Sequence, residues 1–128
     1  MKPEQETMLV IDDDSVALEL MERMLSREGY RVATAASGDE GLRLARTLQP
    51  VVILLDVEMP GMSGWDVLTA LKANPDVATI PVIMVTVVDE KTKGRALGVA
   101  DYLIKPIERA RLAAIVKKHS GHKALPGC

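Results

Sequence analysis

A chain of 128 residues can form one domain that buries about 68% of the surface its unfolded form exposes, without disulfides or structural metals. Its composition, 48% hydrophobic and 27% charged, is typical of a globular protein, and its net charge of −2 provides no basic field for nucleic acid or an anionic membrane. The start lacks the apolar segment of a signal peptide, no apolar run could span a bilayer, and the single cysteine, Cys128, allows neither an internal disulfide nor a zinc site, so we expect a cytoplasmic protein.

Short apolar runs alternate with helical patterns along the whole chain. The runs predict strands at 8–11, 31–35, 51–55, 81–85 and 101–104. A first helix follows residue 14 and stops at Gly29, a second ends before Pro50, and three more are expected at 65–73, 90–97 and 107–118. The first helix carries one stripe of apolar residues, Ala17, Leu20, Met21, Met24 and Leu25, and the second carries another, Gly41, Leu44, Ala45 and Leu48. In the last helix Leu112, Ile115 and Val116 are expected to face inward.

This order predicts an α/β fold made of five βα units. The runs VVILL and VIMV are apolar on both faces, which is typical of parallel strands covered by helices on both sides. Right-handed crossovers place the carboxyl ends of all strands at one edge of the sheet, where such folds bind their ligands.

Chemically reactive side chains follow four of the five predicted strands. Because they meet at one edge of the sheet, we expect them to form a single site. They are Asp12, Asp13 and Asp14 after the first strand, Asp56 after the third, Thr86 after the fourth and Lys105 after the fifth.

Neighbouring carboxylates repel one another unless a cation neutralises them, and Mg²⁺ prefers such oxygen ligands. A carboxylate can also act as a nucleophile and form an aspartyl phosphate. Lys105 and the Thr86 hydroxyl would supply positive charge and a hydrogen-bond donor to the phosphoryl oxygens. The set is therefore complete for phosphoryl transfer to a carboxylate.

Each residue alone also has an ordinary explanation, and only their occurrence at one edge favours a site. Asp14 or Ser15 is expected to cap the first helix, and an aspartate such as Asp56 commonly begins a turn. Further acids and both histidines are expected to be surface, capping or solvated residues. These are Asp66, Asp76, Asp89, Asp101, His119 and His122.

Four motifs in this order and spacing resemble the response-regulator receiver domain of two-component signalling. They are LVIDDD (9–14), ILLDVEMPGMSG (53–64), PVIMVT (81–86) and DYLIKP (101–106). The resemblance covers 8–119 and leaves a lead at 1–7 and a tail at 120–128. It implies a flavodoxin-like sheet with the strand order 2-1-3-4-5.

The resemblance also assigns roles to the acids. Asp56 matches the phosphoacceptor, which takes a phosphoryl group from a phosphohistidine of a partner histidine kinase or histidine phosphotransfer protein. Asp13 matches a direct Mg²⁺ ligand beside Asp56, whereas Asp12 matches a ligand that acts mainly through water. Glu58 matches a position that offers its backbone carbonyl to the metal. The chain would be a signalling phosphoacceptor rather than an enzyme with an external substrate.

Three further positions match the response to phosphorylation. Lys105 matches the lysine that pairs with the phosphoryl group, and its bond to Pro106 is expected to be cis. Thr86 and Tyr102 match the switch pair: the hydroxyl moves to the phosphoryl oxygen and the aromatic ring turns inward behind it.

The chain departs from the family pattern at three points. Val87 stands where a small residue is usual, which predicts a narrower entrance and slower reaction with small donors, and Val88 predicts a long-lived phosphoryl group. Only 18 residues separate Thr86 from Lys105, so the fourth helix is expected to be short. In this short segment between Thr86 and Lys105 the chain resembles the receivers of hybrid kinases and phosphorelays. We expect a monomer or weak dimer without DNA or membrane as a direct partner, either stand-alone or part of a longer protein.

Two alternatives remain open at this point. A small phosphatase of the haloacid-dehalogenase type would use Asp56 as nucleophile and Glu58 as general acid. The second alternative is a phosphorylation-independent scaffold or a flavodoxin-like binding module. The three acids after the first strand would, however, repel the phosphate of a flavin.

Overall fold

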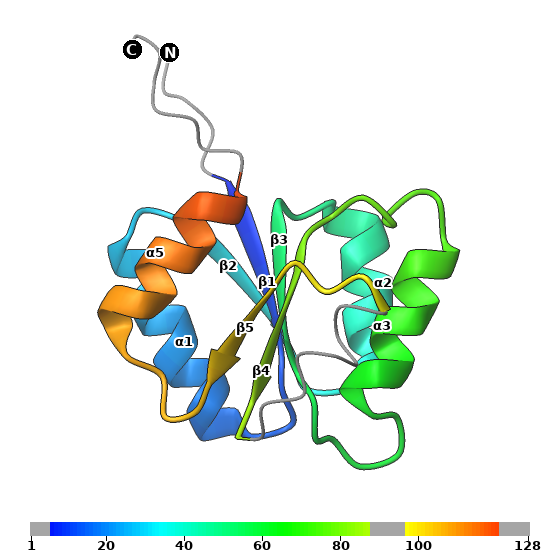
Figure 1. The fold of residues 1–128 in the computed structure, drawn as a ribbon, viewed down its shortest axis with the longest axis horizontal. Coiled ribbons are helices and arrows are strands. Elements are labelled where there is room, and N and C mark those ends of the chain that lie inside the picture. Colours follow the sequence, from blue (N-terminus) through cyan, green and yellow to red (C-terminus); the bar gives the residue numbers. More distant parts are fainter. Residues whose placement is uncertain (1–5, 88–96, 121–128) are drawn as a thin grey trace, which may run out of the picture.

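The computed structural model describes residues 6–87 and 97–120 (Figure 1). Five parallel strands form one sheet in the order β2-β1-β3-β4-β5, which confirms the predicted fold class. The strands are β1 (Thr7–Ile11), β2 (Arg31–Ala35), β3 (Val52–Asp56), β4 (Val82–Thr86) and β5 (Asp101–Ile104). The helices are α1 (Ser15–Arg27), α2 (Gly38–Leu48), α3 (Gly64–Ala73) and α5 (Arg109–His119).

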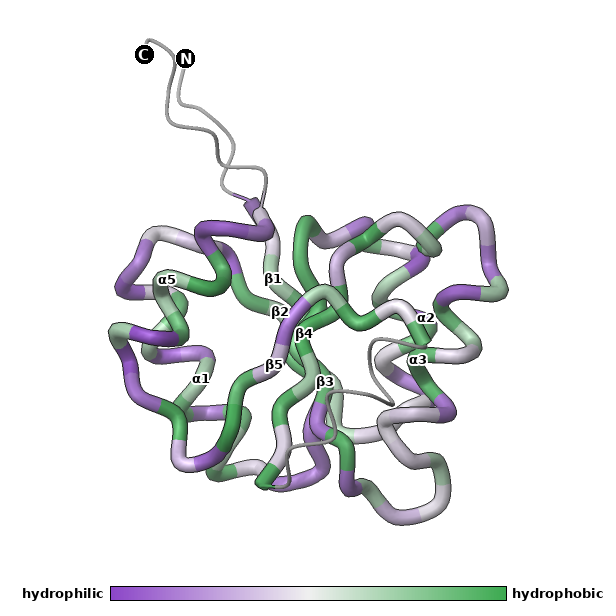
Figure 2. Tube along the Cα trace, in the orientation of Figure 1, coloured by the Kyte–Doolittle hydropathy of each residue, from purple (hydrophilic) through white to green (hydrophobic). Residues whose placement is uncertain are grey.

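The sheet is buried on both faces because its central strands are apolar throughout. Along β3, Ile53 and Leu55 pack in one core cluster with α2 and α3, whereas Val52 and Leu54 pack in a second cluster with α1 and α5. The two pairs of helices flank the sheet in Figure 1, and hydrophobic colour is concentrated along the strands in Figure 2. The expectation of two-sided burial is therefore confirmed.

Strands β3 and β4 each begin and end one residue later than predicted. Asp56 is paired with Val85 in the sheet, and the Val57 N–H donates a hydrogen bond of 3.1 Å to the Val85 carbonyl. Asp56 and Thr86 are consequently the last residues of their strands rather than the first residues after them. Regular backbone pairing holds both side chains at the carboxyl edge.

The core-facing side chains of α1 and α2 differ in part from the predicted set. In α1 the buried residues are Leu18, Met21 and Leu25, whereas Leu20 is 49% exposed. Leu48 at the end of α2 is 41% exposed. Both leucines belong to the apolar stripes predicted for their helices but are exposed, because the spacing of apolar residues alone does not show which part of a stripe meets the sheet.

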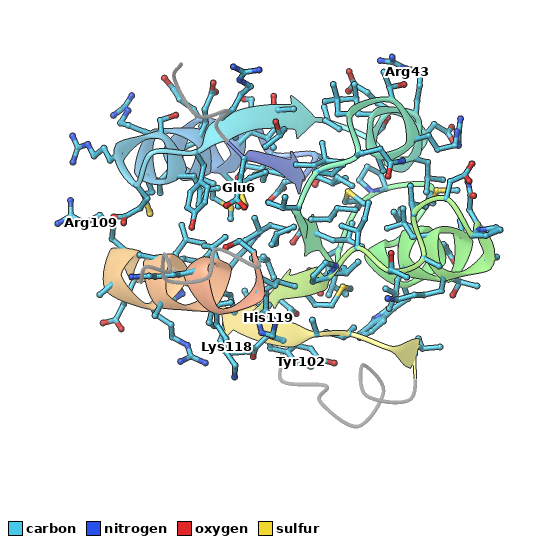
Figure 3. All side chains as sticks on the ribbon, turned by 90° about the horizontal axis from the view of Figure 1, so that it is seen from above. Glu6, Arg43, Tyr102, Arg109, Lys118 and His119 are labelled. Carbon is cyan, nitrogen blue, oxygen red and sulfur yellow. The ribbon has the colours of Figure 1, made fainter. Side chains whose placement is uncertain are left out.

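Helix α5 packs as expected, with Leu112, Ile115 and Val116 buried, but the prediction of a solvated His119 is wrong. The His119 side chain is 18% exposed, and its Nε2 lies 3.0 Å from Oδ2 of Asp101. Asp101 also accepts a hydrogen bond from the Tyr102 N–H at 2.9 Å. In Figure 3 the end of α5 lies beside β5, which brings these residues together.

The predicted helix at 90–97 falls almost wholly outside the described residues, and so do Val88, Asp89, His122 and Cys128. Ser120, assigned to the tail, is buried and caps α5, with its hydroxyl donating to the Lys117 carbonyl. Within 6–87 and 97–120 no helix combines the length and apolar character that crossing a membrane requires.

Candidate functional site

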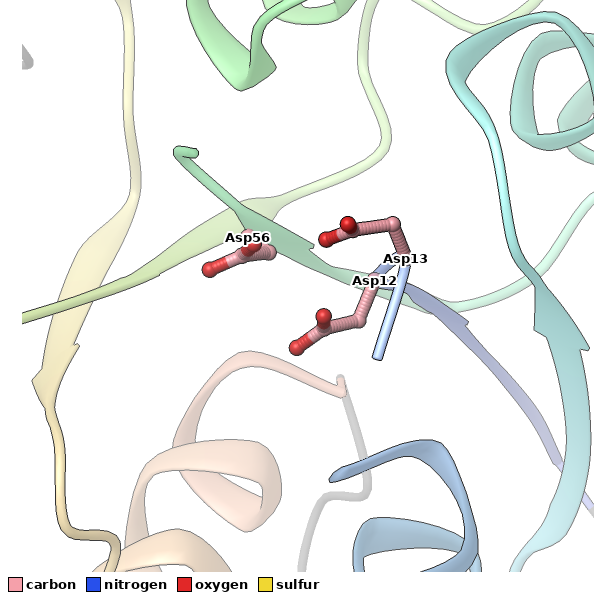
Figure 4. Close-up of side chains that lie close together, drawn as sticks. All are labelled: Asp12, Asp13 and Asp56. Atoms are coloured by element: carbon pink, nitrogen blue, oxygen red, sulfur yellow. The ribbon is translucent and has the colours of Figure 1, made fainter. Parts of the chain in front are cut away.

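Three aspartates from two adjacent strands gather at the carboxyl edge of the sheet (Figure 4). Asp12 and Asp13 follow β1, and Asp56 ends β3. One carboxylate oxygen from each lies within 4.8 Å of the others. Asp12 and Asp56 are buried, at 2% and 6% exposure, whereas Asp13 is exposed. The cluster is therefore open to solvent on one side only.

Local hydrogen bonds explain the shape of the turn that carries Asp12 and Asp13. The Asp12 N–H continues the sheet by donating to the Ala35 carbonyl at 3.0 Å, and Asp12 Oδ1 accepts the Asp14 N–H at 2.9 Å. Asp14 caps α1, because its carboxylate accepts the Val16 N–H at 3.0 Å. The capping role expected for Asp14 is confirmed, which leaves Asp13 and the second oxygen of Asp12 facing the cluster.

Lys105 brings the fifth strand into the same site. Its Nζ lies 3.2 Å from Asp56 Oδ1 and 3.5 Å from Asp12 Oδ2. The Lys105 N–H donates to the Thr86 carbonyl at 2.8 Å, and the bond to Pro106 is cis, as the sequence resemblance implied. A backbone hydrogen bond to the end of β4 thus places the lysine between two acids on other strands.

In the described part of the chain, three carboxylates lie together at this edge and one cation, Lys105, pairs with two of them. Burial raises the pKa of Asp56, the neighbouring Asp12 and Asp13 raise it further, and Lys105 only partly opposes them. Burial alone would lower the pKa of Lys105, but the carboxylates of Asp56 and Asp12 raise it overall. With all groups ionised, three carboxylates and one ammonium leave a formal charge of about −2, which a single divalent cation would neutralise.

The oxygen atoms of this cluster fit a hard divalent cation. Asp12 Oδ2 is buried and makes no hydrogen bond within the described part of the chain, although Lys105 lies within ion-pair distance. Mg²⁺ usually takes one or two carboxylates and keeps several water molecules. The exposed position of Asp13 leaves room for that water.

The other predicted residues that the structure describes are not members of the acid cluster. Thr86 is buried, at 3% exposure, and Val87 beyond it is 58% exposed. Tyr102, at 8% exposure, packs in the core cluster on the α2 and α3 side. The side chain of Glu58 is exposed, and this residue is not among the acids close enough to share an ion.

One residue beside the cluster was not singled out from the sequence. Gly64, the first residue of α3, lies against the backbone of Asp56 and Val57 and donates its N–H to the Val57 carbonyl at 2.8 Å. Gly64 is the last residue of the motif at 53–64, but the sequence alone assigned it no role, because its contact with Asp56 arises only when the intervening loop closes.

Comparisons with known proteins agree with this architecture. Residues 8–117 match the family model of the response regulator receiver domain. Response regulator PleD of Caulobacter vibrioides is 40% identical over 112 residues, which are 85% of this chain and 25% of that protein. Protein PilH of Pseudomonas aeruginosa is 36% identical over 107 residues, covering 81% of this chain and 88% of that protein.

The chain spans only part of several relatives. Transcriptional regulatory protein PrrA of Mycobacterium tuberculosis is 43% identical over 112 residues, which are 85% of this chain but 47% of that protein. The chain therefore covers a quarter to about half of PleD and PrrA.

Solved structures share the fold over nearly the whole chain. Chemotaxis protein CheY4 of Vibrio cholerae superimposes with a TM-score of 0.85 at 28% identity, covering 91% of this chain and 99% of that one. The receiver domain of sensor histidine kinase PA1611 from Pseudomonas aeruginosa, solved with a magnesium ion in its active-site cleft, gives 0.84 at 28% identity, covering 92% and 99%. From its sequence match, its strand order and these neighbours, the chain belongs to the response-regulator receiver domains of two-component signalling.

Proposed function

We propose that the protein accepts a phosphoryl group on Asp56 from a phosphohistidine of a histidine kinase or histidine phosphotransfer protein, in a reaction that depends on Mg²⁺. The observation that supports this most directly is the position of the Asp56 carboxylate. It ends the central strand 3.2 Å from the Lys105 ammonium and close to two other acids. A nucleophile, a cation and a set of metal-type oxygens thus lie together at one sheet edge.

In the proposed step an oxygen of Asp56 attacks phosphorus while the bond from phosphorus to the donor's imidazole nitrogen breaks. The bonding electron pair leaves with that nitrogen, and Asp56 becomes a mixed anhydride. Lys105 pairs with one phosphoryl oxygen, and the Thr86 hydroxyl donates a hydrogen bond to another.

Asp13 and Asp56 are the proposed direct ligands of Mg²⁺, with the Glu58 backbone carbonyl as a third and Asp12 acting mainly through water. The bound ion would neutralise negative charge on the phosphoryl oxygens. Asp12 Oδ2 supports this assignment because it is buried, lies 3.5 Å from Lys105 Nζ and makes no hydrogen bond among residues 6–87 and 97–120.

Phosphorylation would act as a switch by adding about −1.5 to −2 charge beside Lys105 and Thr86. We propose that movement of the Thr86 hydroxyl toward this charge is coupled to the ring of Tyr102. The strand register pairs Tyr102 with Met84, two residues before Thr86, and both pack in the same core cluster. Tyr102 is 8% exposed, and we propose that phosphorylation shifts the population of its ring orientations toward the inward one.

Receiver domains are signalling phosphoacceptors, and we propose the same cytoplasmic role here rather than turnover of an external phosphomonoester. The phosphatase alternative requires Glu58 as general acid, and its exposed side chain lies outside the acid cluster. Retention of one phosphoryl group per chain supports the receiver role. Steady release of phosphate from a phosphomonoester would contradict it.

The decisive experiment titrates the protein with beryllofluoride, which mimics a phosphoryl group on a carboxylate, in the presence of Mg²⁺. Amide NMR shifts or Trp65 fluorescence would report binding. We expect saturation in the wild type and none in Asp56→Asn or in wild type with EDTA. Equal responses of the wild type and Asp56→Asn would refute the assignment of Asp56.

A further inference from the structure

The contact between the start of α3 and the end of β3 leaves no space for a side chain. A Cβ atom on Gly64 would lie 2.8 Å from Val57 Cα and 3.0 Å from the carbonyl carbon of Asp56, and nearer still to the Asp56 carbonyl oxygen. All three are backbone atoms, so no side-chain rotation can relieve the conflict. Either α3 or the backbone of Asp56 would have to move.

Both sides of this contact are held firmly. Asp56 and Val57 are buried, Asp56 is the last residue of β3, and the Val57 N–H donates to the Val85 carbonyl at 3.1 Å. On the helix side, Ser63 and Asp66 form a reciprocal capping box at the start of α3. The next turn of α3 is anchored in the core by fully buried Val67 and Leu68.

We propose that Gly64 is a positioning residue for phosphoryl transfer. Its missing side chain lets the amino end of α3 rest directly on the backbone of the phosphoacceptor. This contact sets where the Asp56 carboxylate stands relative to Lys105, and it closes the loop that carries Glu58. The inference rests on the proposed function and extends it to a residue that touches neither the phosphoryl group nor the metal.

Gly41 offers a matched control because it is equally crowded by different atoms. A Cβ there would lie 2.5 Å from Cδ1 and 2.9 Å from Cγ1 of Ile11, which belong to a side chain that can shift. Gly41 lies in α2 and makes no close approach to the Asp56 backbone. Gly41→Ala therefore tests the general effect of overpacking.

The experiment compares wild type, Gly64→Ala and Gly41→Ala at a temperature where circular dichroism shows all three to be folded. Phosphorylation by acetyl phosphate in excess Mg²⁺ gives the rate, and Mg²⁺ titration followed by amide NMR shifts gives the metal affinity. Displacing a reacting group by about 1 Å can slow a reaction about 100-fold, so we expect Gly64→Ala to react at least about tenfold more slowly. It should also bind Mg²⁺ more weakly, while Gly41→Ala should stay within about twofold of wild type on both measures.

The outcomes separate this inference from the proposed function. Wild-type rate and Mg²⁺ affinity in Gly64→Ala, or equal losses in Gly41→Ala, would overturn the positioning role. Should the wild type neither take up a phosphoryl group from acetyl phosphate nor bind beryllofluoride, the proposed function fails, and the Mg²⁺ affinities alone decide the role of Gly64. If Gly64→Ala does not fold, Ser63→Ala, which weakens the capping box, is measured in its place. A slower phosphorylation of Ser63→Ala than of Gly41→Ala supports the positioning role, and a wild-type phosphorylation rate in Ser63→Ala overturns that role.

Discussion

Replacing Asp56 by asparagine should stabilise the fold in the absence of metal, although it removes the ion pair with Lys105. At an effective dielectric constant of about 20, the attraction across 3.2 Å is about 5 kcal/mol, and the repulsion from Asp12 at up to 4.8 Å is about 3.5 kcal/mol or more. Exposed Asp13 adds about 1 kcal/mol of repulsion through water. The charge interactions therefore nearly cancel.

The cost of burying the carboxylate then decides the sign. Asp56 is 6% exposed, and taking an ionised group out of water costs several kcal/mol, whereas a neutral amide costs less. The same cause raises the pKa of Asp56. Because asparagine keeps the shape and a hydrogen-bonding oxygen, we expect Asp56→Asn to raise the free energy of unfolding by about 1 to 3 kcal/mol.

Urea unfolding followed by circular dichroism, once in EDTA and once in MgCl₂, measures both effects. At about 100 times its dissociation constant, Mg²⁺ should stabilise the wild type by about 2.7 kcal/mol and the variant by clearly less, so the difference narrows or reverses. Asp76→Asn, at an exposed loop position, serves as a control and should change stability by less than about 0.5 kcal/mol. The reasoning would be refuted if Asp56→Asn were less stable than the wild type in EDTA. It would also be refuted if Mg²⁺ raised the free energy of unfolding of the two proteins equally.

Further predictions concern the entrance to the site and the far end of the sheet. Val87→Ala should react severalfold faster with acetyl phosphate, because Val87 stands exposed directly beyond Thr86; an unchanged rate would contradict a narrowed entrance. The phosphoryl group should outlast minutes because of Val88, and loss of label within seconds would disprove this. Asp101→Asn should cost about 1 kcal/mol at pH 7, since the partly exposed pair with His119 is screened by water. Burial would raise the pKa of Asp101, but the hydrogen bonds from His119 and the Tyr102 N–H lower this pKa overall. The stability that Asp101 contributes is therefore fully present above its ordinary pKa of 3.8, and it is lost as the pH falls through the lower pKa of the folded state. Urea titrations at pH 7 and pH 3 should therefore show the difference between wild type and Asp101→Asn shrinking in acid.

Much of the fold and of the site could be predicted from local patterns. The central strands β1, β3 and β4 were identifiable because a strand between two layers of helices is apolar on both faces, whereas the edge strands β2 and β5 are only partly buried. Their order along the chain also predicted that Asp12, Asp56 and Lys105 would meet, since parallel strands end at one edge. In the structure the carboxylates of Asp12 and Asp56 both lie within ion-pair distance of the Lys105 ammonium.

Contacts between distant segments were decided only by the tertiary structure. Leu20 and Leu48 satisfy the helical spacing but are exposed, whereas the His119 side chain is only 18% exposed because the end of α5 meets the start of β5. Gly64 matters because a closed loop returns it to the backbone of Asp56. Periodicity along a chain predicts which side of an element is apolar, whereas the fit of one surface against another depends on distances that exist only once all the layers are packed.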